Sequence, residues 1–585
     1  MSWLGLSLGG QAELALALLA AFAIAALATA AMRRISPRLD FVSRPKGERW
    51  STLPTPMGGG VGLFLALAPG LWLLSPDLLL GASLIHALGL WDDRRALSPP
   101  VKLVVQTVAA CWVVAAPLER WAPAGQVLLE GPAALAIPLT IAWFVGLANS
   151  VNLLDNMDGS AAGVSLVSAA FVFFLAVDRD PTLAAAAAIT VGATAGFLLH
   201  NFPPARIYMG DAGSLLLGFT LAGLATRIPR DPATPWRNLI VPLFVLGAPV
   251  FDTTLVWFTR RAARRPFLQG GRDHTTHRLM ALGLSPRRTL AVIYGVAAAL
   301  GGVGLFVARS DLGWTVPFMV AGGLGLVLLG VLLGDVAVYK TPEGLPVEPR
   351  PRSPAFLYAV ELAVDVAVLS AAWVAAYALR FDGVPLEHDP RPGAAVAFYL
   401  RESALPALPV VIGCKVTALL ALGLYRGFWR TIRLQDVLRI AQALTLGSLA
   451  VIVVAAVAWR FENYSRGVLA LDWVLSLLGV VACRGGLRAL RTTLDRLADR
   501  PRRALLLGPE ALLGLLDPAR LRAEHRVELQ GALDPGLDPG ALAARAREAG
   551  AEVVLLGVAL PEGDPRLAAL LGAGLLPRRL VVDLE

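Results

Sequence analysis

Apolar runs of about 20 residues recur along most of this chain, with short polar stretches between them. A helix of that length spans the hydrocarbon core of a bilayer, so the pattern predicts an all-α polytopic membrane protein. In the first part of the chain we expect spans at about 12–32, 57–75, 77–91, 101–116, 133–150, 161–177, 182–200, 212–227, 238–258, 288–308 and 314–338. Further spans are expected at about 355–379, 404–424, 438–459 and 467–484, which makes about 11 + 4 transmembrane helices.

The pattern changes in three later stretches. Residues 342–354 are rich in Pro and charge, as a linker is. Residues 484–503 are basic and partly amphipathic, which suits an anionic membrane surface. Beyond them, strand-like apolar runs alternate with helical stretches, which predicts a small C-terminal α/β domain. Those runs are 504–508, 527–529, 553–557 and 580–583.

These changes divide the chain into five predicted parts. They are a polytopic membrane domain (1–340), a linker (341–354), a four-helix membrane region (355–484), a basic juxtamembrane segment (485–503) and the α/β domain (504–585).

Composition agrees with a membrane protein. Of 585 residues, 56% are hydrophobic and only 16% are charged, which is unusual for a soluble chain of this size. The net charge of +9 comes from basic residues between the apolar runs, so it indicates orientation in the membrane and not nucleic-acid binding. Cys111, Cys414 and Cys483 lie in or beside apolar runs and predict neither disulfides nor a Cys-based metal site. The run at 14–32 lacks a basic leader and a cleavage site, so we expect a retained helix.

The basic loops alternate along the chain. Arginines crowd the loops near 33–49, 94–95 and 260–288, whereas the loops at 178–181 and 309–311 are short or mixed. Because positively charged loops stay in the cytoplasm, the N-terminus is predicted outside and the C-terminal domain inside.

The loops rich in carboxylate, amide or imidazole groups fall on the same predicted cytoplasmic side. They contain Asp92-Asp93, Asn149-Ser-Val-Asn152-Leu-Leu-Asp155-Asn156-Met-Asp158, Met209-Gly210-Asp211-Ala-Gly213-Ser214 and Asp273-His274-Thr-Thr-His277-Arg278. Chance would scatter such groups over both faces. Their convergence predicts one site at the membrane surface, open to a soluble substrate and to a membrane lipid together.

The second of these loops ends an apolar run. Positions three and four apart share a helix face, so Asn149, Asn152 and either Asp155 or Asn156 are expected along one side of a helix end. The chain is expected to turn at Asp158. The alternative is an ordinary solvated loop.

Carboxylates without cysteine ligands suit a hard cation, Mg²⁺ or alternatively Mn²⁺. Asp92 and Asp93 would diverge by about 100° on a helix, so we expect one of them to act as a base or to orient a nucleophile. Asp211 lies in the Gly-rich segment 210–213, where backbone can approach a ligand, although a plain turn is the alternative. Lys102 and nearby arginines supply positive charge for phosphates.

Four of the six histidines fall into two groups. His274 and His277, three apart on a basic loop, are expected to bind phosphate or sugar, because further zinc ligands are not evident. His86 and His200 lie in or at the end of apolar runs, where satisfied packing is expected.

In chain order, these motifs resemble the polyprenyl-phosphate N-acetylhexosamine-1-phosphate transferases of the WecA and TagO type, relatives of MraY. The resemblance covers about residues 10–340 and includes Arg44-Pro45 and Pro54-Thr-Pro56-Met57-Gly58-Gly59 upstream. It implies transfer of a sugar 1-phosphate from a UDP-sugar to undecaprenyl phosphate, with release of UMP. That step would begin an envelope polysaccharide pathway at the bacterial inner membrane.

The resemblance also implies residue roles. Asp211 would bind Mg²⁺, Asp92 would handle the lipid phosphate, and Asn152 and Asp155 would help to hold nucleotide or metal. His274 and His277 would bind the diphosphate or sugar. The full predicted set is Asp92, Asp93 and Asp155 as catalytic, Asp211 as metal ligand, and Lys102, Asn149, Asn152, Asp158, Gly210, His274, His277 and Arg278 as substrate-binding.

Two departures leave the sugar open. The usual His-x-His-His becomes His274-Thr-Thr-His277, and Met57 replaces a common Arg. The triple-His pattern of the MraY branch is absent, which argues against a large peptide-bearing substrate.

Residues 373–383 and 424–430 resemble the membrane region of CapD-type nucleotide-sugar dehydratases, and the α/β part resembles the small Rossmann-like domain that follows it there. Its first loop, 508–514, lacks Gly-x-Gly-x-x-Gly, so dinucleotide binding is poorly supported. No Tyr-x-x-x-Lys occurs. This second part is expected to hold polysaccharide-pathway enzymes or nucleotide-sugar near the transferase.

Two other function classes compete. A polytopic transporter or flippase would need ionisable groups near the midplane of several helices, whereas here they cluster at helix ends. A non-catalytic scaffold for polysaccharide assembly would fit the second part alone. The sequence leaves open whether the protein forms a homo-oligomer.

Overall fold

The computed structural model describes residues 10–579 with gaps, of which the longest are 45–53, 116–127, 339–353 and 426–433. The shorter gaps are 129–131, 231–233, 266–270, 337, 387–388, 390–392, 460–464, 498–501, 517–520, 522–526, 550, 552, 558–560, 562–563 and 574. The chain forms two compact units, one of Met1–Ala281 and Ser285–Leu494 and the other of Leu282–Leu284 and Asp495–Glu585. The predicted linker lies almost wholly outside the described residues.

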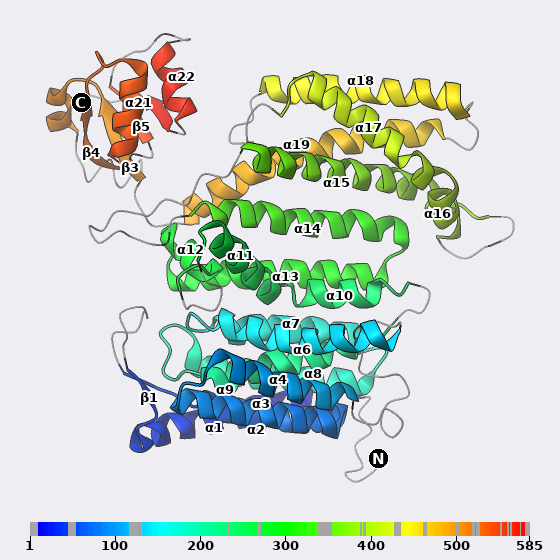
Figure 1. The fold of residues 1–585 in the computed structure, drawn as a ribbon, viewed down its shortest axis with the longest axis vertical. Helices are drawn as coiled ribbons and strands as arrows, with labels where there is room; N and C mark the ends of the chain where they lie inside the picture. The colour runs from blue at the N-terminus through cyan, green and yellow to red at the C-terminus, as the bar shows by residue number, and fades with distance from the viewer. Residues whose placement is uncertain are drawn as a thin grey trace. The chain divides into compact units, whose positions relative to one another are not determined.

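The first part of the chain is helical, as the apolar runs predict (Figure 1). Its helices are α1 (Gln11–Ile35), α2 (Gly59–Leu74), α3 (Pro76–Arg94), α4 (Pro99–Ala115), α6 (Ala133–Leu154), α7 (Ser160–Ala176), α8 (Pro181–Asn201), α9 (Gly210–Thr226), α10 (Arg237–Val245), α11 (Gly247–Ala262), α12 (Thr275–Ala281), α13 (Pro286–Arg309) and α14 (Leu312–Gly334). A 3₁₀ turn (Ser36–Leu39) follows α1, and β1 (Val42–Ser43) pairs antiparallel with β2 (Thr55–Pro56).

The boundary between α2 and α3 follows from local chemistry. Ser75 ends α2 in an extended conformation, and its hydroxyl accepts the N–H groups of Asp77 at 3.2 Å and Leu78 at 3.4 Å. Pro76 follows at the first helical position, where its missing N–H costs nothing.

The single helix predicted at 238–258 is wrong. The structure has two helices there, α10 and α11, bent by 81°. Pro242 lies inside α10 and Pro249 near the start of α11. Proline removes a helical hydrogen bond and clashes with the preceding turn, so two of them explain the break at Leu246.

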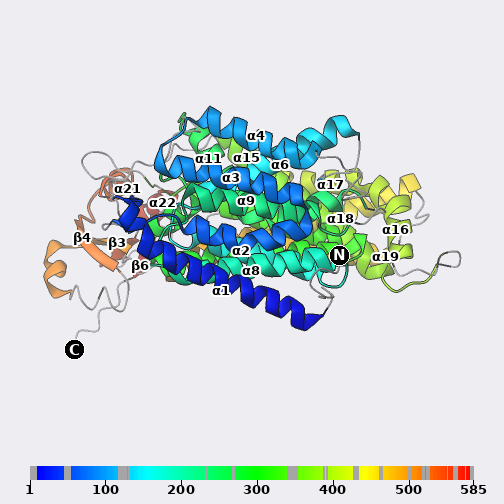
Figure 2. The same cartoon turned by 90° about the horizontal axis from the view of Figure 1, so that it is seen from below.

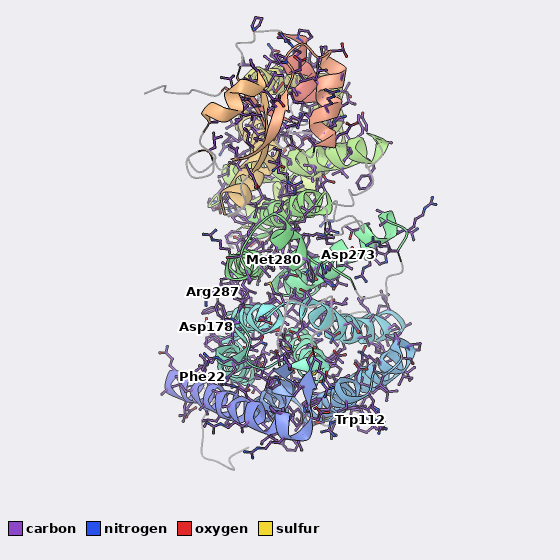
Figure 3. All side chains as sticks on the ribbon, turned by 90° about the vertical axis from the view of Figure 1, so that its left-hand side faces the viewer. Phe22, Trp112, Asp178, Asp273, Met280 and Arg287 are labelled. Atoms are coloured by element: carbon purple, nitrogen blue, oxygen red, sulfur yellow. The ribbon has the colours of Figure 1, made fainter. Side chains whose placement is uncertain are left out.

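Among the described residues, nine helices are long and apolar enough to cross a membrane, or ten if the bent pair is one span. The helices α2, α4 and α7 are apolar but shorter. Large apolar side chains are exposed on the bundle. Leu19 on α1 is 60% exposed, and Trp112 on α4, labelled in Figure 3, is 54% exposed. These features are those of a multi-pass membrane protein, while the predicted total of fifteen spans stays a prediction.

The helix α9 is the buried centre of the first part. Every residue from Ala212 to Thr226 is buried, and α9 packs most extensively against α3 and α6 (Figure 2). Two glycines allow the backbones to touch. A Cβ on Gly89 would lie 2.4 Å from the N and Cα atoms of Ala212, and one on Gly218 would lie 2.4 Å from the Leu147 carbonyl oxygen. The start of α9 is thereby fixed beside the ends of α3 and α6.

A second group of helices follows: α15 (Pro354–Phe381), α16 (Ala394–Tyr399), α17 (Leu405–Ala421), α18 (Leu434–Trp459) and α19 (Arg466–Leu497), with a π-helical turn (Leu400–Ala404) before α17. The four predicted helices occur here, but α19 runs 13 residues beyond the predicted end at 484. Much of the predicted basic segment is therefore a continuation of α19. In addition, α14 packs against α15.

Buried ion pairs join these later helices. Lys415 on α17 contacts Asp472 on α19 at 2.5 Å, and Arg484 on α19 contacts Asp365 on α15 at 2.6 Å. All four side chains are at most 4% exposed. The sequence pattern did not predict these pairs.

The C-terminal unit is an α/β domain, as predicted. Its strands β3 (Arg502–Leu507), β4 (Val527–Leu533), β5 (Val553–Leu556) and β6 (Leu576–Arg579) form a parallel sheet in the order β4-β3-β5-β6, accompanied by a 3₁₀ helix (Glu510–Leu515), α21 (Pro539–Glu548) and α22 (Pro565–Gly572). The fourth predicted strand, 580–583, lies outside the described residues. Among the described residues, β3 is followed by a short 3₁₀ helix and not by the α-helix that opens a dinucleotide-binding loop.

Candidate functional site

Two carboxylates and one lysine meet where α3 ends and α4 and α9 begin. Lys102 Nζ lies 2.5 Å from Asp92 Oδ2 and 2.8 Å from Asp211 Oδ2. The other oxygen of Asp92 accepts the N–H of Leu97 at 2.7 Å. Three residues predicted from separate motifs are thus in direct contact.

The end of α6 adds an amide to this group. Asn152 Nδ2 donates to Asp211 Oδ1 at 3.0 Å and to Ser214 Oγ at 2.9 Å. Both oxygens of Asp211 are therefore held, one by an ammonium group and one by an amide. The resulting group of Asp92, Lys102, Asn152 and Asp211 is called the carboxylate cluster below.

Asp93 occupies a different place. Its two oxygens accept the backbone N–H groups of Asp211 at 2.8 Å and Ala212 at 3.1 Å, so it caps the N-terminus of α9 from the neighbouring helix. Gly210, at φ +69°, makes room for this contact, because a Cβ there would lie 2.3 Å from Asp93 Oδ2. These contacts position Asp211, and a catalytic role for Asp93 stays a prediction.

The segment 149–158 distributes its polar groups over several helices. Asn149 pairs with Gln106 on α4, with its Nδ2 donating to Gln106 Oε1 at 2.6 Å. Asp155 is the C-cap of α6. Asp158 accepts the N–H of Ala205 at 2.8 Å, while burial raises the pKa of this carboxyl above its usual range. Asn149 and Asn152 therefore contact different partners, and the predicted turn occurs at Asp158.

The turn itself is held from two sides. Gly159 has φ +77°, its N–H donates to Asn201 Oδ1 at 2.9 Å, and its carbonyl accepts the Tyr294 hydroxyl at 2.7 Å. A solvated loop would not be held in this way, so that alternative is wrong.

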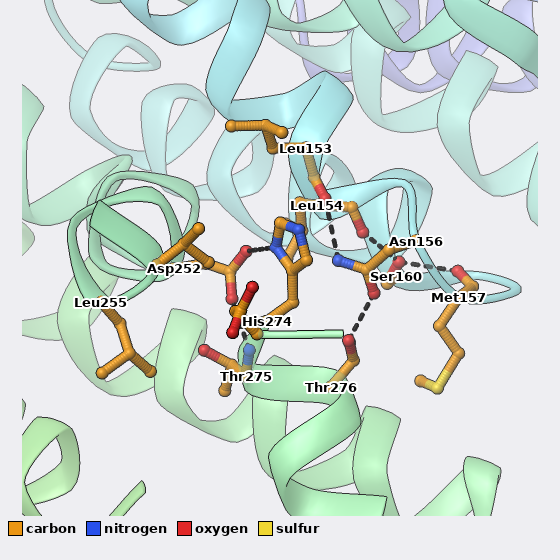
Figure 4. Close-up of polar contacts among 12 residues, drawn as sticks. Leu153, Leu154, Asn156, Met157, Ser160, Asp252, Leu255, His274, Thr275 and Thr276 are labelled. Atoms are coloured by element: carbon orange, nitrogen blue, oxygen red, sulfur yellow. Dashed lines mark hydrogen bonds and ion pairs between the residues drawn. The ribbon is translucent and has the colours of Figure 1, made fainter. Parts of the chain in front are cut away.

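Residues 273–278, called the histidine loop below, pack against the same segment (Figure 4). The Thr276 hydroxyl donates to Asn156 Oδ1, and Asn156 Nδ2 donates to the Leu153 carbonyl. His274 Nδ1 lies 2.8 Å from Asp252 Oδ2 on α11. Asn152 in the last turn of α6 and Asn156 just beyond its end connect the carboxylate cluster to the histidine loop.

The remaining residues of this loop are buried in protein contacts. The Arg278 side chain is held by backbone carbonyls, with Nε donating to Asp273 at 2.7 Å and Nη1 to Leu333 at 2.8 Å. Burial, with the nearby His274 and Arg272, lowers the pKa of His277 to about 4. His277 is therefore neutral at pH 7, and substrate binding by His277 and Arg278 stays a prediction.

His86 and His200 are packing residues, as expected. His86 Nδ1 lies 3.1 Å from the Ala212 carbonyl, and its ring stacks on Phe64 at 4.6 Å. His200 Nε2 lies 3.1 Å from the Ala26 carbonyl.

Binding of a divalent cation at the carboxylate cluster stays a prediction. In the part of the chain that the structure describes, no group of three or more His, Cys, Asp or Glu side chains is arranged to hold a metal ion. Mg²⁺, however, is commonly bound by one or two carboxylates, with water and substrate phosphates completing its shell. Asp92 and Asp211 are two carboxylates of that kind, and in this structure Lys102 contacts both of them.

Fold and site together define a multi-pass membrane protein with a carboxylate, amide and lysine cluster at converging helix ends. The model of glycosyl transferase family 4 matches residues 76–228. The probable undecaprenyl-phosphate N-acetylglucosaminyl 1-phosphate transferase of Bacillus subtilis is 32% identical over 302 residues, covering 50% of this chain and 84% of that protein. The chain belongs to this family of polyprenyl-phosphate sugar-phosphate transferases.

Two other relatives mark the breadth of the family. The decaprenyl-phosphate N-acetylglucosaminephosphotransferase of Mycobacterium tuberculosis is 31% identical over 320 residues, covering 48% of this chain and 79% of that protein. The phospho-N-acetylmuramoyl-pentapeptide-transferase of Thermosynechococcus vestitus is 34% identical over 238 residues, covering 37% and 60%. The family resemblance inferred from the motifs is confirmed.

Proposed function

We propose that this protein transfers an N-acetylhexosamine 1-phosphate from a UDP-sugar to undecaprenyl phosphate and releases UMP. Family membership and the names of the relatives in Bacillus subtilis and Mycobacterium tuberculosis support this reaction class. The observation that carries it is the carboxylate cluster, in which a lysine and an amide hold two carboxylates at one place.

The chemistry is a phosphoryl transfer. A phosphate oxygen of the lipid attacks the β-phosphorus of the UDP-sugar, the bond from that phosphorus to the bridging oxygen breaks, and UMP leaves with that oxygen. Asp92 orients the attacking phosphate and can accept its proton, while Lys102 neutralises developing negative charge. Mg²⁺, or Mn²⁺ in its place, would be held by Asp211 with Asp92 and would offset charge on the phosphate oxygens.

In this proposal the protein lies in the bacterial inner membrane and its site opens to the cytoplasm. The arginine-rich loops support this orientation, because loops of that kind stay in the cytoplasm. A cytoplasmic opening admits a soluble nucleotide sugar, and the membrane supplies the lipid.

The test uses the purified full chain in lipid nanodiscs with Mg²⁺, a radiolabelled UDP-sugar and undecaprenyl phosphate. We expect label in the organic phase only when both substrates are present, with UDP-N-acetylhexosamines preferred over UDP-glucose. No lipid-linked label with any UDP-sugar would contradict the proposal.

A further inference from the structure

A buried carboxylate outside the carboxylate cluster holds the histidine loop. Asp252 lies on α11, six residues beyond the break at Leu246, and is 1% exposed. Its Oδ2 lies 2.8 Å from His274 Nδ1, and its Oδ1 accepts the N–H of Thr275 at 2.7 Å (Figure 4). Both carboxylate oxygens of Asp252 therefore contact adjacent residues of the same loop.

Burying the Asp252 carboxylate costs free energy unless its oxygens are paired. A carboxylate removed from water needs charge or strong donors at both oxygens, and removing one partner leaves the other exposed to that cost. The His274 side chain, itself 5% exposed, is the partner with a titratable donor. Because Asp252 accepts at Nδ1, that nitrogen carries a proton, and Nε2 is the ring nitrogen left for a ligand.

The second oxygen fixes the backbone that carries the imidazole. Thr275 opens α12, and the next residue donates its hydroxyl to Asn156. Asn156 lies four residues after Asn152, beyond the end of α6, and Asn152 contacts Asp211. A change at Asp252 would therefore move the imidazole and its loop without touching the carboxylate cluster directly.

A second contact attaches the histidine loop to α11 at a different residue. Arg260, two turns further along α11, contacts Asp273 at 2.8 Å. This ion pair also ties the loop to α11, through the side chain of Asp273. Of the two contacts, only that of Asp252 sets the ring's tautomer and direction.

We propose that Asp252 is a positioning residue that fixes the proton of His274 on Nδ1 and leaves Nε2 to accept a hydrogen bond from a hydroxyl group of the donor's sugar. This rests on the proposed function. A carboxylate behind an imidazole orients the ring and fixes which of its nitrogens carries the proton. Asp252 then acts on the sugar nucleotide and not on the lipid.

The test replaces Asp252 with Asn in the full chain and measures kcat and KM for each substrate separately. Asn can still accept the Thr275 N–H through its carbonyl but cannot accept from His274 at the same time. The variant should lose about tenfold to hundredfold in kcat/KM for the UDP-sugar, with the KM for undecaprenyl phosphate unchanged. Thr254→Val is the matched control on α11, because the exposed Thr254 hydroxyl bonds only to the Val250 carbonyl of its own helix.

A double variant distinguishes positioning from simple structural support. In His274→Asn, the new amide can still donate to Asp252 but lacks a counterpart of Nε2. If Asp252 acts through His274, adding Asp252→Asn to that variant should change kcat/KM less than about twofold. An equal loss in both backgrounds, or equal losses for both substrates, would overturn the proposal.

If Asp252→Asn is not monodisperse in detergent, Asp252→Glu takes its place. The extra methylene keeps the charge but displaces the imidazole, so the KM for the UDP-sugar should rise, and wild-type constants would overturn the proposal. A wild-type protein without transfer activity would instead refute the proposed function.

Discussion

Replacing Gly89 with Ala tests whether the packing of α3 on α9 sets the geometry of the carboxylate cluster. The added Cβ would lie 2.4 Å from both the N and Cα atoms of Ala212, whereas ordinary contacts of this kind span 3.4–4 Å. These atoms belong to backbone and cannot rotate away. The two helices must therefore separate locally by about 1 Å, because protein interiors have few voids to absorb the methyl group.

The two helices would separate next to the residues of the carboxylate cluster. Asp93, four residues after Gly89, holds the N–H groups that start α9 at 2.8 and 3.1 Å, and Asp211 is the first acidic residue of that helix. A misplacement of about 1 Å in a catalytic group costs on the order of 100-fold in rate. Overpacking of this kind destabilises a fold by about 1–3 kcal/mol. We expect Gly89→Ala to lose about 100-fold in kcat and to unfold at a lower temperature.

The assay compares UMP release and thermal unfolding of purified variants in one detergent. Gly146→Ala is the control, since a Cβ at this α6 position meets nothing within 4 Å. It should keep wild-type activity and can gain slightly in stability from the better helix propensity of Ala. If Gly89→Ala matches Gly146→Ala in both measurements, close packing of α3 on α9 does not set the site.

Four further outcomes follow from the site and the helix pattern. Asp211→Asn should abolish turnover, and Asp92→Asn should impair it severely, while both proteins stay folded; near wild-type rates at saturating Mg²⁺ would remove these residues from the site. Because the folded-state pKa of His277 is about 4 against an ordinary 6.5, the unfolded chain binds that proton first as pH falls, so stability should drop between about pH 6.5 and 4; His277→Gln should lose less Tm over that window, and identical pH profiles would contradict this. Single cysteines, in a chain without the native three, should label from the cytoplasm in the arginine-rich loop before α13 and from outside between α13 and α14; labelling of both from outside would reverse the orientation. A chain ending at Leu345 should still release UMP, because the carboxylate cluster and the histidine loop precede α13; a monodisperse but inactive product, restored by adding the second half, would show a shared site.

The helices could be predicted because apolar runs of membrane length leave few alternatives. The prediction at 133–150 starts at the observed residue of α6, and 182–200 falls within one residue of α8 at both ends. Errors occur where local chemistry is not visible in hydropathy. Pro242 and Pro249 stand in an apolar run, and hydropathy alone predicts one continuous helix there, without the break between α10 and α11.

The sequence predicted which residues lie together at the site, but not which of them contact one another. Asp92, Asn152 and Asp211 could be grouped because the basic loops place their segments on one side of the membrane. Which oxygen meets which donor depends on the angle at which helices cross. For that reason the sequence did not reveal that Asp93 caps α9 while its neighbour contacts Lys102.

Charged residues inside apolar helices also indicate buried contacts. Asp252 is an acidic residue inside an apolar helix, and Lys415 and Asp472 occupy similar places in the second group of helices. A charged residue in such a run needs a buried partner. The partner, however, is distant in sequence, 57 residues away for the lysine, so only the fold identifies it.

The most direct test of the proposed reaction follows the two phosphates of the donor. UDP-N-acetylglucosamine is supplied with ³²P either at the α-phosphate or at the β-phosphate, together with the purified chain, Mg²⁺ and undecaprenyl phosphate. Transfer of a sugar 1-phosphate predicts that β-label enters the lipid and α-label is recovered in UMP, in equal amounts. Recovery of both labels in UDP, with only the sugar on the lipid, would contradict the account.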